Sequence, residues 1–283
     1  MGEAGLIARA EPSGHWQRGT TPVAVVMISL NEGHNMQSVL ENLAGWAQEV
    51  FLVDSFSTDD TVEIAQRHGV QVVQRRFQGF GDQWNFALRE LPITAPWTMK
   101  LDPDERLTDA LKLGISNGIA FGEADGFSLL RRLWFMQRPL PIRQEIVRVW
   151  RTGRCTFSDV LVNEHPIVEG ALSLVHGDLE HHDSPDLEHW YDKQNRYTTS
   201  EALSALRGST LAAAPKLFGR TLERRMWVKK NFRHIPFRFF MVSLLLLHER
   251  AMACRMGGLC LVETSRRRLS NEGVQAPRDV TGA

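Results

Sequence analysis

The sequence predicts an α/β fold in which helices flank a mostly parallel central sheet. Three observations support this fold class. Apolar, β-branched runs alternate with amphipathic helical segments, the connections between them are short, and polar residues follow the ends of several runs. Alternation of this kind is typical of right-handed βαβ units. The chain has 283 residues, of which 43% are hydrophobic, so it can bury a sizeable core.

Strands and helices can be assigned in order along the first hundred residues. Residues 23–28 form a continuous apolar run, which predicts a buried strand. The residues that then recur at helical spacing are Met36, Val39, Leu40, Leu43 and Trp46. Further strands are expected at 49–54, 70–73 and 96–101, and further helices at 61–68 and 82–91. Ser57 or Thr58 is the expected N-cap of the second helix.

The hydrophobic pattern loosens after Arg106. Strand-like pieces occur at 126–133, 145–150 and 172–175, and a helix is expected from 186 to about 207. The sequence contains no internal repeat and no low-complexity segment. The first half of the predicted sheet is therefore better defined by the sequence than the second half.

Polar residues follow three of the predicted strands, at the points where these strands end. They are Asn31 and Glu32, Asp54 and Ser57, and Asp102 and Asp104. In open α/β sheets, ligands bind beyond the carboxyl ends of the strands. We therefore expect these side chains to line one crevice.

The acidic segment at 102–105 is the most specific local feature. The carboxylates of Asp102 and Asp104 are separated by one residue and could share a Mg²⁺ or Mn²⁺ ion that also bridges a diphosphate. An ordinary solvated acidic turn is the alternative. The chain has neither a P-loop nor a glycine-rich dinucleotide motif after its first strand. A bound nucleotide would therefore need another means, such as this metal, to neutralise its phosphates.

Four segments in order, at 25–32, 53–61, 79–88 and 101–105, resemble the motifs of the family-two inverting glycosyltransferases with the GT-A (Rossmann-like) fold. The resemblance is greatest to the branch that builds lipopolysaccharide core and bacterial surface polysaccharides. It covers about residues 22 to 207 and fades afterwards. Four ordered motifs are more specific than any one of them.

The resemblance implies roles for individual residues. Leu30, Asn31, Glu32 and Asp54 would line the pocket for the base and ribose of a nucleotide-sugar donor, with a UDP-sugar as the favoured donor. Gln83 and Asn85 would contact the donor, and Asp102 and Asp104 would hold the metal. Ser57 and Asp59 are expected to shape their turn, and Trp84 is expected to lie in the core.

Inverting transfer also needs a general base. The candidate is Glu164, about sixty residues after the acidic segment, with Asp159 as the alternative. Related sequences often have His-Glu at this point, whereas Asn163 precedes the glutamate in this chain. His182 is a candidate third metal ligand, for which packing or acceptor contact is the alternative. Lys193 or Arg196 could meet an acceptor phosphate, although a solvated helix face is the favoured explanation for both.

The last part of the chain is basic and amphipathic. Residues 216–269 contain thirteen basic and three acidic residues, and a nine-residue apolar stretch lies at 239–247. Nine residues are too few to span a bilayer, so the pattern favours an interfacial module on the anionic inner leaflet. A helical subdomain or a homodimer contact is the alternative. No recognised nucleic-acid-binding motif accompanies the basic residues, so nucleic acid is not an expected partner.

The predicted organisation has four parts. Residues 1–21 are expected to form a polar leader, and residues 22–210 the GT-A catalytic domain. This domain is divided into a nucleotide half at 22–106 and an acceptor half at 107–210. The basic module follows at 211–268, and a flexible tail at 269–283. Three cysteines without C-x-x-C spacing favour a reducing compartment. No secretory signal is expected. The expected location is cytoplasmic and peripheral, on the inner face of the plasma membrane.

The functional hypothesis is a metal-dependent inverting glycosyltransferase, specifically a hexosyltransferase. It would move a sugar from a nucleotide-sugar to a saccharide or polyprenyl-diphosphate-linked acceptor in cell-envelope or exopolysaccharide biosynthesis. A sugar-nucleotide nucleotidyltransferase is one alternative, although it usually needs a glycine-rich phosphate loop. A catalytically inactive scaffold subunit of a polysaccharide assembly complex is the other.

Overall fold

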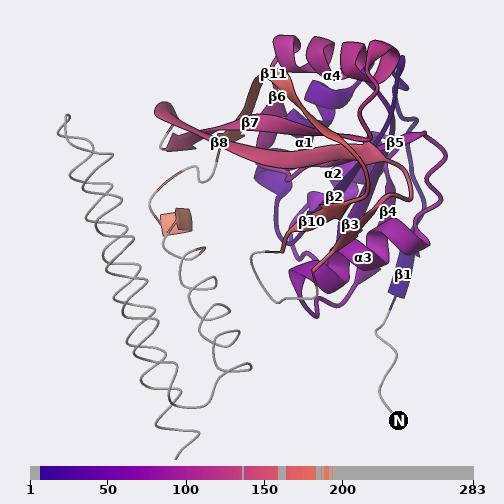
Figure 1. Ribbon diagram of the computed structural model, residues 1–283. Helices are drawn as coiled ribbons and strands as arrows, with labels where there is room; N and C mark the ends of the chain where they lie inside the picture. Colours follow the sequence, from indigo (N-terminus) through magenta and orange to yellow (C-terminus); the bar gives the residue numbers. More distant parts are fainter. Residues whose placement is uncertain are drawn as a thin grey trace, which may run out of the picture. The chain divides into compact units, whose positions relative to one another are not determined.

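The computed structural model of the chain describes residues 7–135, 137–158 and 164–182, together with 186, 188–190 and 193 (Figure 1). The helices are α1 (Gly33–Leu43), α2 (Thr61–Arg67), α3 (Phe80–Glu90) and α4 (Asp109–Phe121). The strands are β1 (Ile7–Ala10), β2 (Thr21–Ser29), β3 (Ala47–Asp54), β4 (Gln71–Arg75), β5 (Trp97–Lys100), β6 (Glu105–Leu107), β7 (Gly126–Phe135), β8 (Arg138–Arg151), β9 (Cys155–Phe157), β10 (Pro166–Val168) and β11 (Leu172–His182). All of these elements belong to the first of two compact units, which ends at Trp190.

Nine of the described strands form one mixed sheet, in the order β1-β4-β3-β2-β5-β8-β7-β11-β6. The run β4-β3-β2-β5 is parallel throughout, as predicted for the first half of the chain. The second half is mixed, because β8 pairs antiparallel with both β5 and β7, whereas β11 pairs parallel with β7 and antiparallel with β6. The carboxyl ends of β2, β3 and β5 therefore meet at one edge of the sheet.

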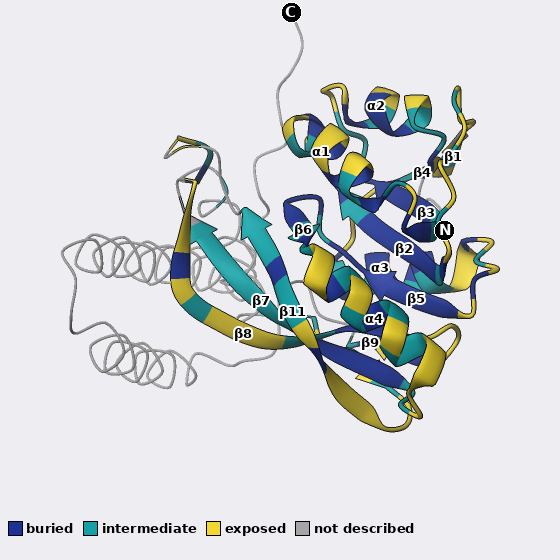
Figure 2. Ribbon diagram, turned by 90° about the horizontal axis from the view of Figure 1, so that it is seen from above, coloured by how far each residue is buried: buried dark blue, intermediate teal, exposed yellow. Residues whose placement is uncertain are grey.

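Two apolar clusters cover the two faces of the sheet. Val23, Val25 and Met27 of β2 pack in one cluster with residues of α1, α2 and α4. Ala24 and Val26, which alternate with them, pack in the other cluster with residues of α3 and with Phe157 of β9. Figure 2 shows the central strands as buried and the outer sides of the helices as exposed. A strand that is buried on both faces explains the continuous apolar run at 23–28.

The structure corrects several predictions about single elements. Helix α1 ends at Leu43, so Trp46 lies beyond it. Neither Ser57 nor Thr58 caps α2, because its N-cap residue is Asp60 and the Asp59 side chain accepts from the Thr61 amide. Strand β1 lies within the expected polar leader and pairs with β4. Helix α4 was not predicted, and most of the helix expected from 186 to about 207 lies outside the described residues.

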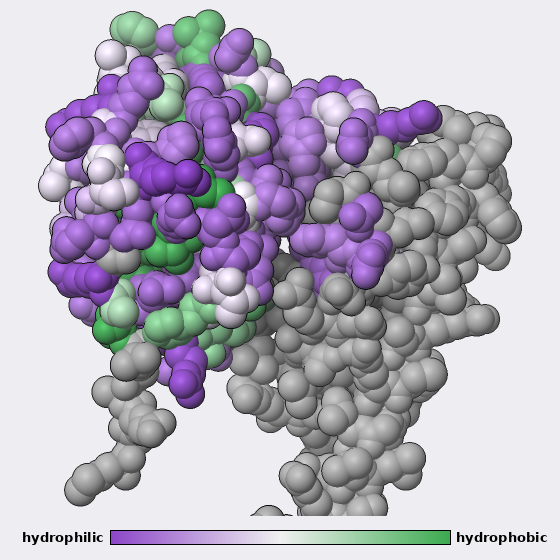
Figure 3. Space-filling view, turned by 180° about the vertical axis from the view of Figure 1, so that it is seen from behind, coloured by the Kyte–Doolittle hydropathy of each residue, from purple (hydrophilic) through white to green (hydrophobic). Residues whose placement is uncertain are grey.

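The described surface is largely hydrophilic on the side shown in Figure 3, where hydrophobic side chains are visible at the α4 end of the molecule. Two large apolar residues of α4, Leu113 and Phe121, are exposed there. Within the part of the chain that the structure describes, no helix is long and apolar enough to cross a bilayer.

Two glycines with positive φ allow a direct test of the packing between α4 and β11. At Gly177 (φ 119°) an added Cβ would lie 2.4 Å from the Leu111 nitrogen, whereas at Gly153 (φ 84°) it would meet nothing within 4 Å. Gly153→Ala should therefore cost about 1 kcal/mol of unfolding free energy from backbone strain alone. Gly177→Ala should cost roughly 3 kcal/mol because overpacking adds to the strain. Urea unfolding of both variants measures the difference, and equal losses would contradict the described packing.

Candidate active site

The loops that follow β2 and β3 are joined by hydrogen bonds from Asn31. The Asn31 backbone is left-handed (φ 57°), a conformation that asparagine tolerates better than most residues. Its amide donates to Ser57 Oγ at 2.8 Å, and its Oδ1 accepts from the Thr58 amide at 2.8 Å. These bonds hold the two loops against each other at the carboxyl edge of the sheet.

Asp59 supports the starts of two helices. Its carboxylate accepts from the Gly33 amide of α1 at 2.9 Å and from the Thr61 amide of α2 at 3.1 Å. Burial alone would raise the pKa of Asp59, but the hydrogen bonds from Thr61 and Gly33 outweigh it and lower the pKa below its ordinary value. Asp59 therefore shapes the turn, as predicted.

Asp54, at the end of β3, is completely buried. One carboxylate oxygen accepts from Ser29 Oγ at 2.9 Å and from Ser57 Oγ at 2.5 Å. The other accepts from the Ser57 amide at 2.8 Å and from Gln74 Nε2 at 3.0 Å. The contact to a nucleotide base that is predicted for Asp54 would require one of these internal donors to give way. By contrast, Leu30 at the same edge has 43% of its surface exposed.

The predicted donor-contacting residues of α3 have internal partners. Gln83 is fully buried, accepts from Arg75 at 2.7 Å and donates to Ser55 Oγ at 3.4 Å. The Asn85 amide donates to the Phe157 carbonyl at 2.9 Å and accepts from the Phe157 amide at 2.8 Å. Both ends of the Asn85 amide therefore fasten α3 to β9, and the predicted contact between Asn85 and the donor would require these bonds to give way. Trp84 is fully buried, as predicted.

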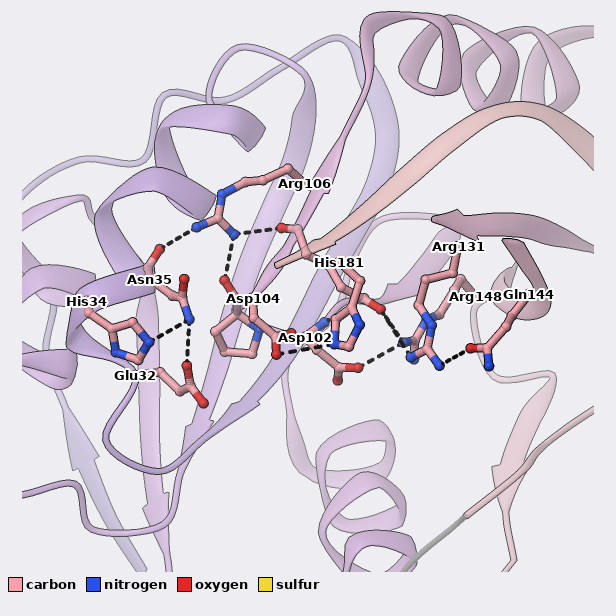
Figure 4. Close-up of polar contacts among 12 residues, drawn as sticks. Glu32, His34, Asn35, Asp102, Asp104, Arg106, Arg131, Gln144, Arg148 and His181 are labelled. Carbon is pink, nitrogen blue, oxygen red and sulfur yellow. Dashed lines mark hydrogen bonds and ion pairs between the residues drawn. The ribbon is translucent and has the colours of Figure 1, made fainter. Parts of the chain in front are cut away.

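The turn after β5 is organised by Glu105, whose side chain is completely buried. Glu105 Oε2 accepts from the Asp102 amide at 3.0 Å, and Oε1 accepts from Arg148 Nη2 at 2.6 Å. The same Arg148 nitrogen donates to Asp102 Oδ2 at 2.8 Å (Figure 4). Arg131 adds a second positive charge 3.7 Å from Glu105. One arginine of β8 thus fixes both Glu105 and Asp102.

The charges of this cluster keep Asp102 ionised. Burial alone would raise the pKa of Asp102, but the positive charges of Arg148 and then Lys100 outweigh it and hold the pKa below its ordinary value. Burial opposes the charged form of Arg148 as well, but Glu105 and Asp102 raise its pKa. Asp102 therefore remains a negatively charged carboxylate that could bind a cation, and 30% of its side chain is exposed.

The structure brings His181, rather than the predicted His182, to the side chain of Asp104. His181 Nε2 lies 3.3 Å from Asp104 Oδ2. Burial lowers the pKa of His181, but the Asp104 charge outweighs it and leaves the pKa raised. The His182 ring packs on Trp134 at 4.6 Å between centroids, and burial followed by the Arg106 charge lowers its pKa. Adjacent residues of a strand face opposite sides, so only one of the two histidines faces Asp104.

Arg106 connects the acidic turn to the start of α1. Its guanidinium donates to the Pro103 carbonyl at 2.6 Å and to the Asn35 carbonyl at 3.0 Å (Figure 4). Asn35 Nδ2 in turn donates to Glu32 Oε2 at 2.9 Å. Hydrogen bonds of Arg106 and Asn35 therefore join the acidic turn to the segment that follows β2.

Glu164, the candidate base, forms an ion pair with Lys100, and both side chains are buried to about nine-tenths, with 11% and 8% exposed. Lys100 precedes Asp102 by two residues. The structure therefore brings Glu164 to the strand that carries the acidic turn. Asp159, Asn163 and Arg196 lie outside the described residues.

Sequence reasoning missed Arg148, Arg131 and Lys100 as members of the site, and it chose His182 from the adjacent histidine pair 181–182 instead of His181. Lys100 carried a local signal, because a charged residue within the apolar run 96–101 needs a buried partner. Arg148 reaches the site through the antiparallel pairing of β8 with β5. No local pattern predicts that pairing.

The donor set at the acidic turn fits a hard divalent cation. The described residues gather no group of three or more His, Cys, Asp or Glu side chains that could hold a metal. They supply two carboxylates, those of Asp102 and Asp104. In proteins, Mg²⁺ is usually bound by one or two carboxylates, and substrate phosphates and water supply the remaining ligands. A nucleoside diphosphate would thus complete the coordination.

The pair of Glu105 and Arg148 should behave as one energetic unit. Glu105→Gln and Arg148→Met should each cost about 3 kcal/mol of unfolding free energy, because each leaves a buried charge without its partner. The double variant should lose clearly less than the sum. Urea unfolding measures all three, and additive losses would contradict the coupling. Arg151→Met is the matched control on β8, because its pair with Asp125 is about half exposed and contributes about 1 kcal/mol or less.

Comparisons with known proteins identify a family over part of the chain. Residues 24–157 match the model of the family described as Glycosyl transferase family 2. An uncharacterized glycosyltransferase of Rickettsia conorii is 25% identical over 230 residues, 75% of this chain and 79% of that protein. The lipopolysaccharide core biosynthesis glycosyltransferase LpsC of Rhizobium meliloti is 28% identical over 193 residues, 64% of this chain and 70% of that protein.

Among solved structures, the mannosyltransferase PcManGT from Pyrobaculum calidifontis, in complex with GDP-Man and Mn²⁺, is 15% identical with a TM-score of 0.48. That match covers 86% of this chain and 90% of the other chain. The region matched by the family model includes both loops, the acidic turn and Arg148. The chain therefore contains a glycosyl transferase family 2 domain, which spans residues 24–157.

Proposed function

We propose that the chain is a metal-dependent inverting glycosyltransferase, specifically a hexosyltransferase, of cell-envelope or exopolysaccharide biosynthesis. Its donor is a nucleotide-sugar, with a UDP-sugar favoured, and its acceptor is a saccharide or a polyprenyl-diphosphate-linked saccharide. The observation that carries the proposal is the acidic turn of Asp102 and Asp104, held by Glu105 and Arg148 beside the loops that follow β2 and β3. The relative LpsC is named for lipopolysaccharide core biosynthesis, which supports a role of this chain in cell-envelope biosynthesis.

In this proposal the carboxyl edge of the sheet binds the nucleotide. Leu30, Asn31 and Glu32 line the base and ribose, and the exposed Leu30 side chain offers an apolar surface to the base. Asp54 keeps the loop in shape and meets the base if an internal donor gives way. Gln83 faces the donor from α3 only if its hydrogen bond to Arg75 rearranges. The residues that bind are thus held by hydrogen bonds before the donor arrives.

Asp102 and Asp104 would hold Mg²⁺ or Mn²⁺. When bound, this ion would neutralise the negative charge that develops on the departing nucleoside diphosphate. His181, which lies against Asp104, replaces His182 as the imidazole nearest to the pair. Arg148 keeps Asp102 anionic and fixes its direction, because it donates to Asp102 Oδ2 and is itself anchored on Glu105.

Glu164 acts as the general base. It accepts the proton of the acceptor hydroxyl as that oxygen bonds to the anomeric carbon, while the bond from this carbon to the diphosphate oxygen breaks with both electrons leaving on the diphosphate. One displacement of this kind inverts the anomeric configuration. The enzyme would work in the cytoplasm at the inner face of the plasma membrane, with the basic module at 211–268, which lies outside the described residues, on the membrane surface.

Nucleotide binding tests the acidic turn directly. We expect one of UDP, GDP and dTDP, with UDP favoured, to bind the full chain in the presence of Mn²⁺ or Mg²⁺, and EDTA to weaken this binding by about tenfold or more. Asp104→Ala should have the same effect as EDTA. Isothermal titration calorimetry measures both.

The matched control is Asp109→Ala, an exposed carboxylate in the first turn of α4 that should leave nucleotide affinity unchanged. Absence of binding by all three nucleotides would refute the transferase proposal and favour the scaffold alternative. Release of pyrophosphate from a nucleoside triphosphate and a sugar phosphate would instead favour the nucleotidyltransferase alternative.

A further inference from the structure

Lys100 is a buried cation that the reaction outlined above does not use. It lies at the last position of β5, and 8% of its side chain is exposed. Its ammonium forms an ion pair with Glu164. A buried ammonium is unfavourable unless it is paired, so the ion pair with Glu164 stabilises Lys100 in this position.

Two aromatic rings complete the surroundings of Lys100. The ammonium lies 4.6 Å from the centroid of the Trp84 ring and 5.4 Å from that of Phe157. Trp84 is fully buried in α3, and Phe157 of β9 is held by both ends of the Asn85 amide. Ring faces attract cations at this range. The position of the ammonium is therefore fixed by rigid elements on both sides.

The same charge acts on the acidic turn. Asp102 follows Lys100 by two residues, and the positive charge of Lys100 acts on Asp102 after that of Arg148. The candidate metal ligand Asp102 and the candidate base Glu164 are far apart in the sequence, and the Lys100 charge acts on both.

We propose that Lys100 is the positioning residue of Glu164: its ammonium, fixed over Trp84 and Phe157, holds one oxygen of the base beside the acidic turn. The proposal deepens the proposed function and rests on it. Glu164 Oε1 accepts from the Lys100 ammonium. In this proposal the other carboxylate oxygen, Oε2, receives the proton of the acceptor hydroxyl.

This arrangement has a chemical consequence for the base. The ion pair with Lys100 restricts the rotation of the Glu164 carboxylate. In this proposal the proton passes from the acceptor oxygen to Oε2, and Lys100 takes no part in the transfer. Lys100 therefore affects the rate through the placement of Glu164 and does not touch the donor.

A double-mutant cycle on the full chain tests this role. We expect Lys100→Met to lower kcat by about tenfold to a hundredfold with the donor KM unchanged, and Glu164→Gln to lower kcat by about a hundredfold or more. In the double variant, Lys100→Met should cause no further loss, because it acts through Glu164. Lys100→Arg should recover about tenfold over Lys100→Met, since it restores the cation.

Three outcomes would overturn the proposal. If Lys100→Met lowers kcat as much in the Glu164→Gln background as alone, Lys100 does not act through Glu164. If the loss appears in the donor KM, Lys100 binds the donor. If Lys100→Arg is no better than Lys100→Met, the cation is not what matters. Lys112→Met, in α4, is the matched control and should leave kcat unchanged.

Failure of the proposed function gives a different result. In that case the wild-type chain transfers or hydrolyses no nucleotide-sugar with Mn²⁺ or Mg²⁺, and both proposals fail together. If the wild type is active and the cycle is additive, only the role of Lys100 fails. Thermal unfolding of each variant identifies losses of activity that come from unfolding, and Lys100→Arg then decides the question.

Discussion

The buried carboxylate of Glu105 is the interaction on which the site depends. A fully buried carboxylate is tolerated only when cations and amides satisfy it. Glu105 meets this requirement with Arg148, Arg131 and the Asp102 amide. Because Arg148 also binds the Asp102 side chain, the conformation of the acidic turn and the charge of its first carboxylate are set together.

The two halves of the sheet contribute different parts of this arrangement. The parallel strands β2, β3 and β5 bring the polar loops to one edge, where Asn31 donates to Ser57 and Asp59 accepts from the Gly33 amide. The mixed half supplies the cations, because the antiparallel strand β8 carries Arg148 and β7 carries Arg131. The polar edge of the sheet and the cations around the acidic turn therefore come from segments that are distant in the sequence.

Local patterns were sufficient for the parallel half of the fold and for the acidic turn. The apolar run at 23–28 and the spacing in 102–105 are local, and the structure places both as expected. The rest depends on contacts between distant residues. The register of β11 against β6 places His181 rather than His182 beside Asp104. The packing of α3 on β9 places the Asn85 amide against the backbone of Phe157. The residues that neighbour these positions in the sequence predict neither contact.

The central claim is that Asp102 and Asp104 hold a divalent cation at the carboxyl edge of the sheet. Anomalous diffraction from crystals of the full chain grown with Mn²⁺ and UDP tests it most directly. The account predicts an anomalous peak within about 2.0–2.6 Å of a carboxylate oxygen of Asp102 or Asp104. Bound UDP with no peak at this turn, or with the manganese held by other residues, would contradict it.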